Sequence, residues 1–374
     1  MGAIVVVVGG GTPDTNNHKY WNGDIQWFTP SEIGRDKYVT NSLRTISEEG
    51  LNKSSAKLLP IGTILLSSRA TVGECSINKV ECTTNQGFQS LIPKEYFSKE
   101  FVFYLMQTKR KELIRKSCGS TFLEISANEV RKIEIAVPTY KEQEKISKLL
   151  ALLDERISTQ NKIIDKLQSL IKGIMVELQK QGQNKGNWRN VLLSKVLTER
   201  DERNTNFYQV FSVSVSRGVI NQVDYLGRSF AARDISKYNV VHYGDLVYTK
   251  SPTGAYPYGI VKQNLNQENV AVSPLYGVYI PNSLSVGTYL HEYFMSEINT
   301  HNYLHPLIQK GAKNTINITN QRFLENSVPM PVCANELLLI SKLLLSFNDK
   351  IKYQKSILQQ YQKQKQYLLR QMFI

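Results

Sequence analysis

The sequence repeats itself, and this repeat constrains the architecture more than any other feature. Ile146–Leu150 returns as Ile340–Leu344 with the same five residues, an offset of 194 positions. The same offset aligns Asp154–Ile157 with Asn348–Ile351, and weaker matches with drifting offsets continue upstream. Self-similarity at a fixed period indicates a duplicated structural unit. Each half of the chain is therefore expected to hold one mixed domain followed by one helix.

Both copies of the repeated segment carry apolar residues at heptad spacing. The a and d positions fall at Leu150, Leu153, Ile157, Gln160, Ile164, Leu167, Ile171, Ile174 and Leu178, and again at Leu344, Phe347, Ile351, Gln354, Leu358, Tyr361, Lys365, Leu368 and Met372. Spacing of this kind, uninterrupted by proline, predicts long helices that pack on each other. The first helix is expected from about Lys141 to Gln181, between Pro138 and Gly182.

Chain order sets the direction of these helices. The second helix begins at the second domain, so it can pack along the first helix only by running antiparallel to it. The prediction is an α/β (α+β) protein with two similar domains held apart by two antiparallel coiled-coil helices and related by a pseudo-two-fold repeat. The expected segments are a first mixed domain (1–138), a spacer helix (139–182), a second mixed domain (183–332) and a C-terminal helix (333–374).

Gln160 and Gln354 occupy equivalent positions in the two helical seams. A polar residue in such a seam usually lowers stability and specifies register or partner. We therefore hypothesise that the two side chains lie within one layer and hydrogen-bond to each other. The alternative is two glutamines that are solvated independently.

The domains between the helices show short strand patterns separated by turn residues. Strands are predicted at 61–67, 75–80 and 89–93 in the first domain, and at 246–250, 259–262 and 276–280 in the second. Helices are predicted at 100–115 and 289–299. Polar, glycine-rich loops join the strands, and loops of this kind on a rigid scaffold commonly carry recognition groups.

Composition favours a cytoplasmic protein with a polyanionic partner. The net charge is +14, and neutralising phosphates with such a surplus would release counterions. The alternative is a basic protein whose charge only keeps it soluble, and charge alone does not separate the two. The longest aliphatic run, Ile4–Val8, is far too short to cross a membrane, and it lacks the flanks of a secretory signal. The four cysteines are scattered without a C-x-x-C pair, so free thiols are expected rather than a metal or redox site.

Several segments in both halves of the sequence resemble the motifs of one protein family. In the first half these segments are Gly10–Pro13, Tyr20–Ile25, Trp27–Ile33, Leu65–Gly73 and Thr84–Phe88. Together they resemble a target-recognition domain of type I restriction–modification specificity subunits. In the second half, Lys250–Ser251, Gly254–Gly259 and Val272–Tyr276 resemble a different recognition-domain type of the same family. Val137–Pro138 with Glu142–Gln143 and the following helix resembles the spacer of that family.

The resemblance implies a non-catalytic subunit that binds double-stranded DNA. Each recognition domain would read one half of a bipartite, asymmetric target. The spacer helices would dock two methyltransferase subunits, and restriction (motor) subunits would join that core. No cofactor is expected in this chain, whereas its partners would use S-adenosylmethionine, ATP and magnesium. One departure concerns Trp188–Leu193, whose counterpart would precede Met1, so the first domain is expected to be shortened at its start.

Polar and cationic loop residues are the candidates for contacting DNA. Arginine can pair with guanine, asparagine or glutamine with adenine, and lysine more often contacts phosphate. In the first domain the candidates are Arg35, Lys37, Ser68, Arg69, Asn85 and Gln86. In the second they are Lys250, Ser251, Thr253, Tyr256, Lys310, Lys313 and Asn314. For each one the alternative is a solvated loop side chain.

Patterns that would indicate catalysis are incomplete. Gly9–Gly11 follows a valine run as in a dinucleotide fingerprint, but Asp14 stands where the third glycine should be, so a turn is favoured. His301 and His305 share helical spacing but lack the glutamate of a metalloprotease motif, so surface or packing histidines and no metal site are expected. No phosphate-binding P-loop motif occurs.

Two other classes of function stand against the DNA-binding subunit. A coiled-coil adaptor would join proteins without touching DNA, and a salt-dependent affinity for DNA distinguishes the two. A stand-alone enzyme would methylate or cut DNA without partners, which no motif in the sequence supports.

Overall fold

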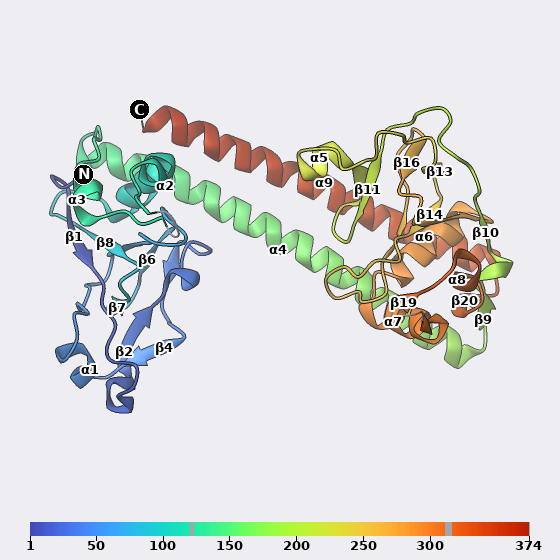
Figure 1. Ribbon diagram of the computed structural model, residues 1–374, viewed down its shortest axis with the longest axis horizontal. Helices are drawn as coiled ribbons and strands as arrows, with labels where there is room; N and C mark the ends of the chain where they lie inside the picture. Colours follow the sequence, from blue (N-terminus) through green and yellow to red (C-terminus); the bar gives the residue numbers. More distant parts are fainter. Residues whose placement is uncertain (120–122, 311–315, 374) are drawn as a thin grey trace. The chain divides into compact units, whose positions relative to one another are not determined.

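The computed structural model describes residues 1–119, 123–310 and 316–373 (Figure 1), with 310, 316 and 317 described by their backbone alone. Contacts divide the chain into two compact units. Unit 1 consists of Met1–Gln160 and Ile357–Ile374, and unit 2 of Asn161–Ser356. The long helices are α4, Tyr140–Lys185, and α9, Ala334–Met372. Each unit therefore combines one mixed domain with part of both long helices.

The larger sheet of unit 1 has five strands in the order β1–β8–β5–β6–β3. Neighbouring strands are antiparallel except β3 and β6, which are parallel. The strands are β1 Val5–Gly9, β8 Gln89–Pro93, β5 Ile64–Leu66, β6 Cys75–Asn78 and β3 Tyr38–Val39. The expected strands at 61–67, 75–80 and 89–93 are thus confirmed as β5, β6 and β8, of which β5 and β6 are shorter than predicted.

A smaller sheet in unit 1 has the order β4–β2–β7. Its elements and the short helices beside it are η1 His18–Tyr20, β2 Trp21–Phe28, η2 Pro30–Glu32, β4 Arg44–Ile46, α1 Glu48–Asn52 and β7 Cys82–Thr84. The rings of Trp21 and Trp27 meet edge to face at 5.1 Å between centroids. The indole of Trp27 also donates to the Gly11 carbonyl at 2.9 Å, which holds the loop after β1 against this sheet.

The core of unit 1 is built around α2, Lys99–Arg115, which confirms the predicted helix at 100–115. Ser98 caps this helix, and six consecutive residues from Phe101 to Met106 are buried. A second short helix, α3, spans Ala127–Arg131. Leu150 of α4 belongs to the same core, and Leu368 and Phe373 of the C-terminal segment pack against it. Unit 1 therefore needs residues from both ends of the sequence.

The heptad pattern correctly identifies the packed faces of both long helices. None of the a and d residues named above is exposed. In unit 1, Lys365 Nζ lies 2.6 Å from Asp154 Oδ1. In unit 2, Trp188, which follows the end of α4, donates to Glu336 in the first turn of α9 at 2.8 Å. Within each unit the start of one helix meets the end of the other, so the packed segments run antiparallel.

The end of α4 differs from the prediction. The helix continues through Gly182 and ends at Lys185, before Gly186 with a φ of +70°. A left-handed glycine is a common helix terminator because it has no Cβ atom to clash. Gly182 has another reason to be glycine, since a Cβ atom there would lie 2.1 Å from Cδ1 of Trp188.

Unit 2 contains a four-stranded sheet in the order β10–β17–β14–β15 and several two-stranded sheets. The strands are β9 Trp188–Leu192, β10 Leu197–Glu199, β11 Phe211–Ser214, β12 Gly218–Asn221, β13 Asn239–Val241, β14 Leu246–Tyr248, β15 Val261–Gln263, β16 Val270–Val272, β17 Gly277–Pro281, β18 Gln309–Lys310, β19 Ile316–Asn317 and β20 Ser327–Pro331. The short helices are η3 Leu193–Lys195, α5 Gln222–Leu226, α6 Leu284–Tyr293, α7 Glu297–Leu304, η4 His305–Leu307 and α8 Asn320–Phe323. The strands predicted at 246–250, 259–262 and 276–280 are confirmed as β14, β15 and β17.

The prediction of one continuous helix at 289–299 is wrong, because these residues span parts of two separate helices, α6 and α7. Ser296 caps α7 by accepting from the Asn299 amide, and Thr300 Oγ1 donates to the Phe294 carbonyl at 2.8 Å. Asn299 Nδ2 donates to the Tyr293 carbonyl at 3.3 Å. Side chains thus replace the backbone partners that a continuous helix would need.

The two mixed domains share one topological feature. In unit 1 the three predicted strands pair in the order β8–β5–β6, and in unit 2 their counterparts pair as β17–β14–β15, antiparallel throughout. A helix follows each set, α2 in unit 1 and α6 in unit 2. Among the described residues, no helix is both long and apolar enough to cross a membrane.

Candidate nucleic-acid interface

Four loops of unit 1 meet beyond the end of β5. The Gly11 amide donates to the Thr84 carbonyl at 2.8 Å, and the Asn85 amide donates to the Phe28 carbonyl at 3.0 Å. The Ser68 amide donates to the Gly87 carbonyl at 2.8 Å. We call residues 10–12, 28–34, 67–74 and 84–88 the unit 1 loop cluster. Most residues that carry the family resemblance in the first half lie in it.

The glycine run after β1 serves the close packing of this cluster. A Cβ atom on Gly10 would lie 1.9 Å from the Asn85 carbonyl oxygen, and one on Gly11 would lie 2.3 Å from the Ala56 amide. Residues 10–14 form a loop and no helix begins there, as expected for a turn. The glycines are therefore explained by backbone contacts within unit 1.

Arg69 is the best-placed cation of the unit 1 loop cluster. Its side chain is 43% exposed and pairs with Glu124 through Nε at 3.1 Å and Nη2 at 2.5 Å. The next residue, Ala70, has a φ of +63°, and Gly73 has a φ of +87°. Only a tightly packed loop holds an alanine in the left-handed region. The arginine is thus presented from a firmly shaped loop with a carboxylate that orients it.

The other candidates in the first domain divide into surface and buried groups. Arg35 and Gln86 are exposed, and the oxygen of the Gln86 amide accepts from the Thr12 hydroxyl. Asn85 is half-buried, and its side-chain oxygen accepts from the Gly87 amide at 2.8 Å. Their role in binding stays a prediction. Ser68 is fully buried, which argues against direct contact with DNA.

Lys37 is half-buried and contacts Tyr104, and its role in DNA binding stays a prediction. Its ammonium donates to the Tyr104 hydroxyl at 3.1 Å and lies 4.5 Å from the centre of that ring. Burial lowers the pKa of Lys37. The side chain is therefore engaged with α2, and contact with DNA would require it to leave that site.

In the second domain, the candidates Lys250, Ser251, Thr253 and Tyr256 lie on the loop between β14 and β15. Lys250 is half-buried with a φ of +59°, and Gly259 packs against its backbone, where a Cβ atom would lie 2.8 Å from the Lys250 amide. Burial lowers the pKa of Lys250. Ser251 is exposed and Thr253 half-buried. The loop therefore presents Ser251 and Thr253 at its surface, and their role stays a prediction.

Tyr256 and the 310–314 candidates have different outcomes. The Tyr256 ring is 6% exposed and its hydroxyl donates to the Met295 carbonyl at 2.7 Å, so the side chain supports the loop from inside. Direct contact with DNA is disfavoured for it. Lys310 lies in β18, where only its backbone is described. Lys313 and Asn314 lie outside the described residues.

Beside this loop, the rings of Tyr258, His301 and His305 form a cluster that the sequence did not predict. His301 and His305 stack at 5.2 Å between centroids, and Tyr258 lies 5.3 Å from the first and 5.9 Å from the second. Both histidines are exposed, which agrees with the surface position expected from their spacing. The i, i+4 spacing was the available signal, but nothing local indicated that Tyr258 would join them.

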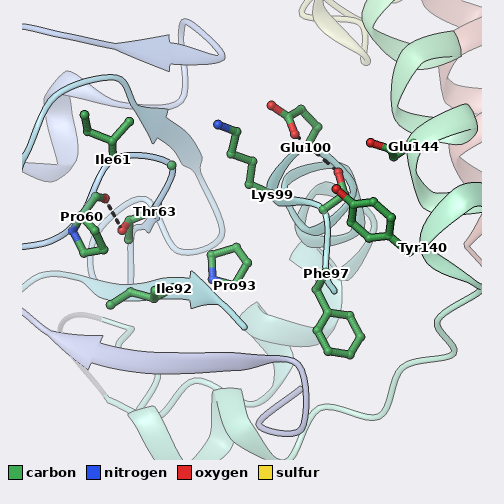
Figure 2. A pocket seen from close by; sticks show the side chains of 12 residues that line it. Pro60, Ile61, Thr63, Ile92, Pro93, Phe97, Lys99, Glu100, Tyr140 and Glu144 are labelled. Carbon is green, nitrogen blue, oxygen red and sulfur yellow. Dashed lines mark hydrogen bonds between the residues drawn. The ribbon is translucent and has the colours of Figure 1, made fainter. Parts of the chain in front are cut away.

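A pocket of about 410 Å³ lies at the opposite end of β5 from the unit 1 loop cluster. Figure 2 shows Lys99, Glu100, Tyr140 and Glu144 on one side of it and the turn with Thr63 on the other. Its mixed charges and its place at the start of α2 and α4 separate it from the cationic loops. Within the described parts of the chain, no group of three or more histidine, cysteine, aspartate or glutamate residues is arranged to hold a metal ion.

Comparison with known proteins finds a family match in the first half of the chain. Residues 2–169 match the type I restriction modification DNA specificity domain. This part of the chain is therefore similar to the type I specificity-subunit family. The matching segment contains the unit 1 loop cluster and most of α4, and it does not include the second-half segments at 250–276 that also carry the sequence resemblance.

Curated relatives agree with the family. The specificity subunit of the MjaIX type I restriction enzyme from Methanocaldococcus jannaschii is 39% identical over 168 residues, 43% of this chain and 39% of that protein. The EcoR124I/EcoR124II specificity subunit from Escherichia coli is 30% identical over 161 residues, 41% of this chain and 40% of that protein. The matched part of the chain therefore spans about two fifths of the length of these relatives.

Solved structures show the same fold. The type I restriction–modification S subunit from M. genitalium aligns with 100% of this chain and 94% of its own, with a TM-score of 0.61 and 11% identity. A chain from a study of complex assembly and conformational transition in the type I system aligns with 98% of this chain and 95% of its own, with a TM-score of 0.55 and 15% identity. At these identities the likeness concerns the fold alone.

Proposed function

We propose that this chain supplies the DNA sequence specificity of a type I restriction–modification complex. It would bind a bipartite, asymmetric target, with the first mixed domain reading one half-site and the second reading the other. The observation that carries the proposal is the specificity-domain match over residues 2–169, which contains the loop cluster presenting Arg69. The net charge of +14 supports a polyanionic ligand.

The proposal gives the chain no chemistry of its own. Methylation would come from two methyltransferase subunits that use S-adenosylmethionine, and ATP- and magnesium-dependent cleavage from restriction subunits that join them. Residues left exposed on the two long helices support such docking. Leu149 and Leu152 are 40% and 50% exposed in unit 1, and Leu343 and Tyr353 are 43% and 65% exposed in unit 2. Leu149 and Leu343 are equivalent in the repeat, which suits two copies of one partner.

DNA binding is tested with full-length protein co-expressed with its methyltransferase partner. Arg69→Ala should weaken binding about tenfold or more and relax selectivity at one half-site, as expected for a lost base contact. Arg370→Ala removes the same charge from an exposed helical position and serves as the matched control. If the two variants behave alike, or if the wild type shows no salt-dependent affinity for DNA, the proposed function is wrong.

The bipartite target is tested by mapping methylated bases. Lys250→Gly keeps the backbone conformation that glycine favours and removes the ammonium. It should change selectivity at the half-site that Arg69→Ala leaves unchanged. A single contiguous target, or both variants acting on one half-site, would rule out the two-domain reading.

Partner docking is tested by native mass spectrometry. Leu149→Glu and Leu343→Glu should each remove one methyltransferase copy, because a carboxylate would enter an apolar contact. Lys148→Glu and Lys342→Glu alter the exposed neighbouring positions and are the controls. Retention of both copies in the two leucine variants would place the docking surface elsewhere.

A further inference from the structure

Equivalent positions of the two long helices form hydrogen bonds to the mixed domains. The helix residue accepts the hydrogen bond in unit 1 and donates it in unit 2. In unit 1, Asp154 on α4 accepts a hydrogen bond from the Tyr104 hydroxyl of α2 at 2.7 Å. In unit 2, Asn348 on α9 donates from its amide to Glu292 Oε1 of α6 at 2.7 Å. Asp154 and Asn348 are aligned by the repeat offset. The helix therefore provides the acceptor in one unit and the donor in the other.

The contact in unit 1 belongs to a wider charged group. Asp154 also pairs with Lys365 of α9 at 2.6 Å, and Lys37 donates to the Tyr104 hydroxyl at 3.1 Å. Glu100 lies close enough to both Tyr38 and Lys37 to influence their ionisation. Two lysines thus converge on one aspartate and one tyrosine. Removing the negative charge of Asp154 would leave Lys365 partly buried without its counter-ion.

The contact in unit 2 is more deeply buried. Glu292 is 8% exposed and Lys262 is 2% exposed. Burial raises the pKa of Glu292, while the Asn348 amide and Lys262 favour its charged form. A carboxylate in place of the Asn348 amide would face Glu292 directly. Two like charges in such a site repel strongly, because little water is present to screen them.

We propose that positions 154 and 348 are reciprocal polar anchors that hold each mixed domain in one orientation on its own helix. Because donor and acceptor are reversed, the donor Tyr104 matches the acceptor Asp154, and the acceptor Glu292 matches the donor Asn348. Each mixed domain therefore matches its own helix position and not the equivalent position of the other helix. Asp154 and Asn348 are positioning residues, which act through Tyr104 and Glu292 rather than on any ligand. This inference rests on the structure of each unit and goes beyond the proposed function.

The main test is hydrogen exchange in the full-length chain, with the reversal of one anchor. Asn348→Asp should lower the protection of α6 on the order of tenfold, and adding Glu292→Gln should restore most of it, because the new amide can donate to the new carboxylate. Ser346→Asp adds the same charge at an exposed position of α9 and should leave α6 unchanged. If Glu292→Gln fails to restore protection, or Ser346→Asp has the same effect, the anchor is overturned.

The anchor in unit 1 is tested in parallel. Asp154→Asn keeps an acceptor for Tyr104 and removes the charge, so protection of α2 should fall and Lys365→Gln should restore part of it. Glu155→Gln, an exposed neighbour, is the control. Equal protection in Asp154→Asn and Glu155→Gln would overturn this half of the inference.

A second readout separates positioning from general stability. With DNA and the methyltransferase partner, Asn348→Asp should affect the half-site read by unit 2 and leave the other intact, whereas global destabilisation would affect both. This readout alone rests on the proposed function. If wild-type protein does not bind DNA, the proposed function fails while the exchange results still decide the anchor.

Discussion

Trp188 packs directly over Gly182, so that a Cβ atom on this glycine would lie 2.1 Å from the indole Cδ1. The indole is 5% exposed and its Nε1 donates to Glu336. The ring thus joins the end of α4 to the start of α9. The contact requires a helix position without a side chain, although glycine lowers intrinsic helix stability by about 1 kcal/mol relative to alanine.

We expect Gly182→Ala to lower the free energy of unfolding in spite of its better helix propensity. Overpacking of a tight contact costs about 1–3 kcal/mol, which outweighs the propensity gain over most of that range. Gly173→Ala is the matched control, because a Cβ atom there meets nothing within 4 Å. Denaturant unfolding should show Gly173→Ala as neutral or stabilised. A Gly182→Ala protein as stable as the Gly173→Ala protein would contradict the packing argument.

Gly186 should tolerate substitution poorly for a different reason. Its φ is +70° and a Cβ atom there would meet nothing within 4 Å, so a substitution strains only the backbone conformation. Gly186→Ala should lower the free energy of unfolding by about 1 kcal/mol. Gly186→Asn should lower it less, because asparagine tolerates this conformation better. Thermal unfolding of the two variants side by side checks the order, and an alanine variant equal to the asparagine variant would exclude it.

His291 should make unit 2 sensitive to mild acid. The backbone N–H of Gln263 donates to His291 Nδ1 at 3.1 Å. Burial, together with the nearby charge of Lys262, lowers the pKa of His291 to about 3. A histidine whose folded pKa lies below its unfolded value stabilises the fold above about pH 6.5. That stability is lost as the pH falls from about 6.5 towards 3, at up to about 1.4 kcal/mol per pH unit.

The acid sensitivity is measured by denaturant unfolding between about pH 7 and pH 5. His291→Asn keeps an acceptor for the Gln263 amide and cannot be protonated. Its unfolding free energy should fall less steeply over this range than that of the wild type. Parallel slopes in the two proteins would show that His291 is protonated equally in the folded and unfolded states.

Gln160 and Gln354 remain a test of seam specificity. Gln160 is buried and Gln354 is half-buried, as expected for their heptad positions. The double variant Gln160→Leu with Gln354→Leu should raise the melting temperature by about 2–4 °C while allowing mixed registers or oligomers. Calorimetry and light scattering measure the two effects. A lower melting temperature would remove the basis for a register role.

The long helices could be predicted because heptad spacing is a local pattern that persists over many turns. The strands at β5, β6 and β8 were found for a similar reason, since turn residues bracket short β-type runs. The break between α6 and α7 was missed because Thr300 and Asn299 compete for backbone carbonyls through their side chains. Propensity over a window does not register such specific bonds.

The candidate site was predictable only in part. Loop position and residue type identified Arg69 as an exposed cation, but its pairing with Glu124 joins residues 55 positions apart. Lys37 and Tyr256 have the residue types of a DNA contact, yet tertiary packing turns both inward. Burial of this kind depends on which elements meet, and a single sequence does not encode that locally.

Unit 1 combines segments from both ends of the sequence, and this affects the order in which the protein folds during synthesis. The rings of Phe373 and Phe101 pack against each other in a tilted arrangement, with 5.0 Å between their centroids, and Leu368 packs against the same core. A ribosome synthesises Phe101 long before it reaches Phe373. During translation, part of the apolar core of the first domain therefore stays uncovered until unit 2 and the C-terminal segment have been synthesised. Completion of the two units should therefore follow an order opposite to that of their synthesis.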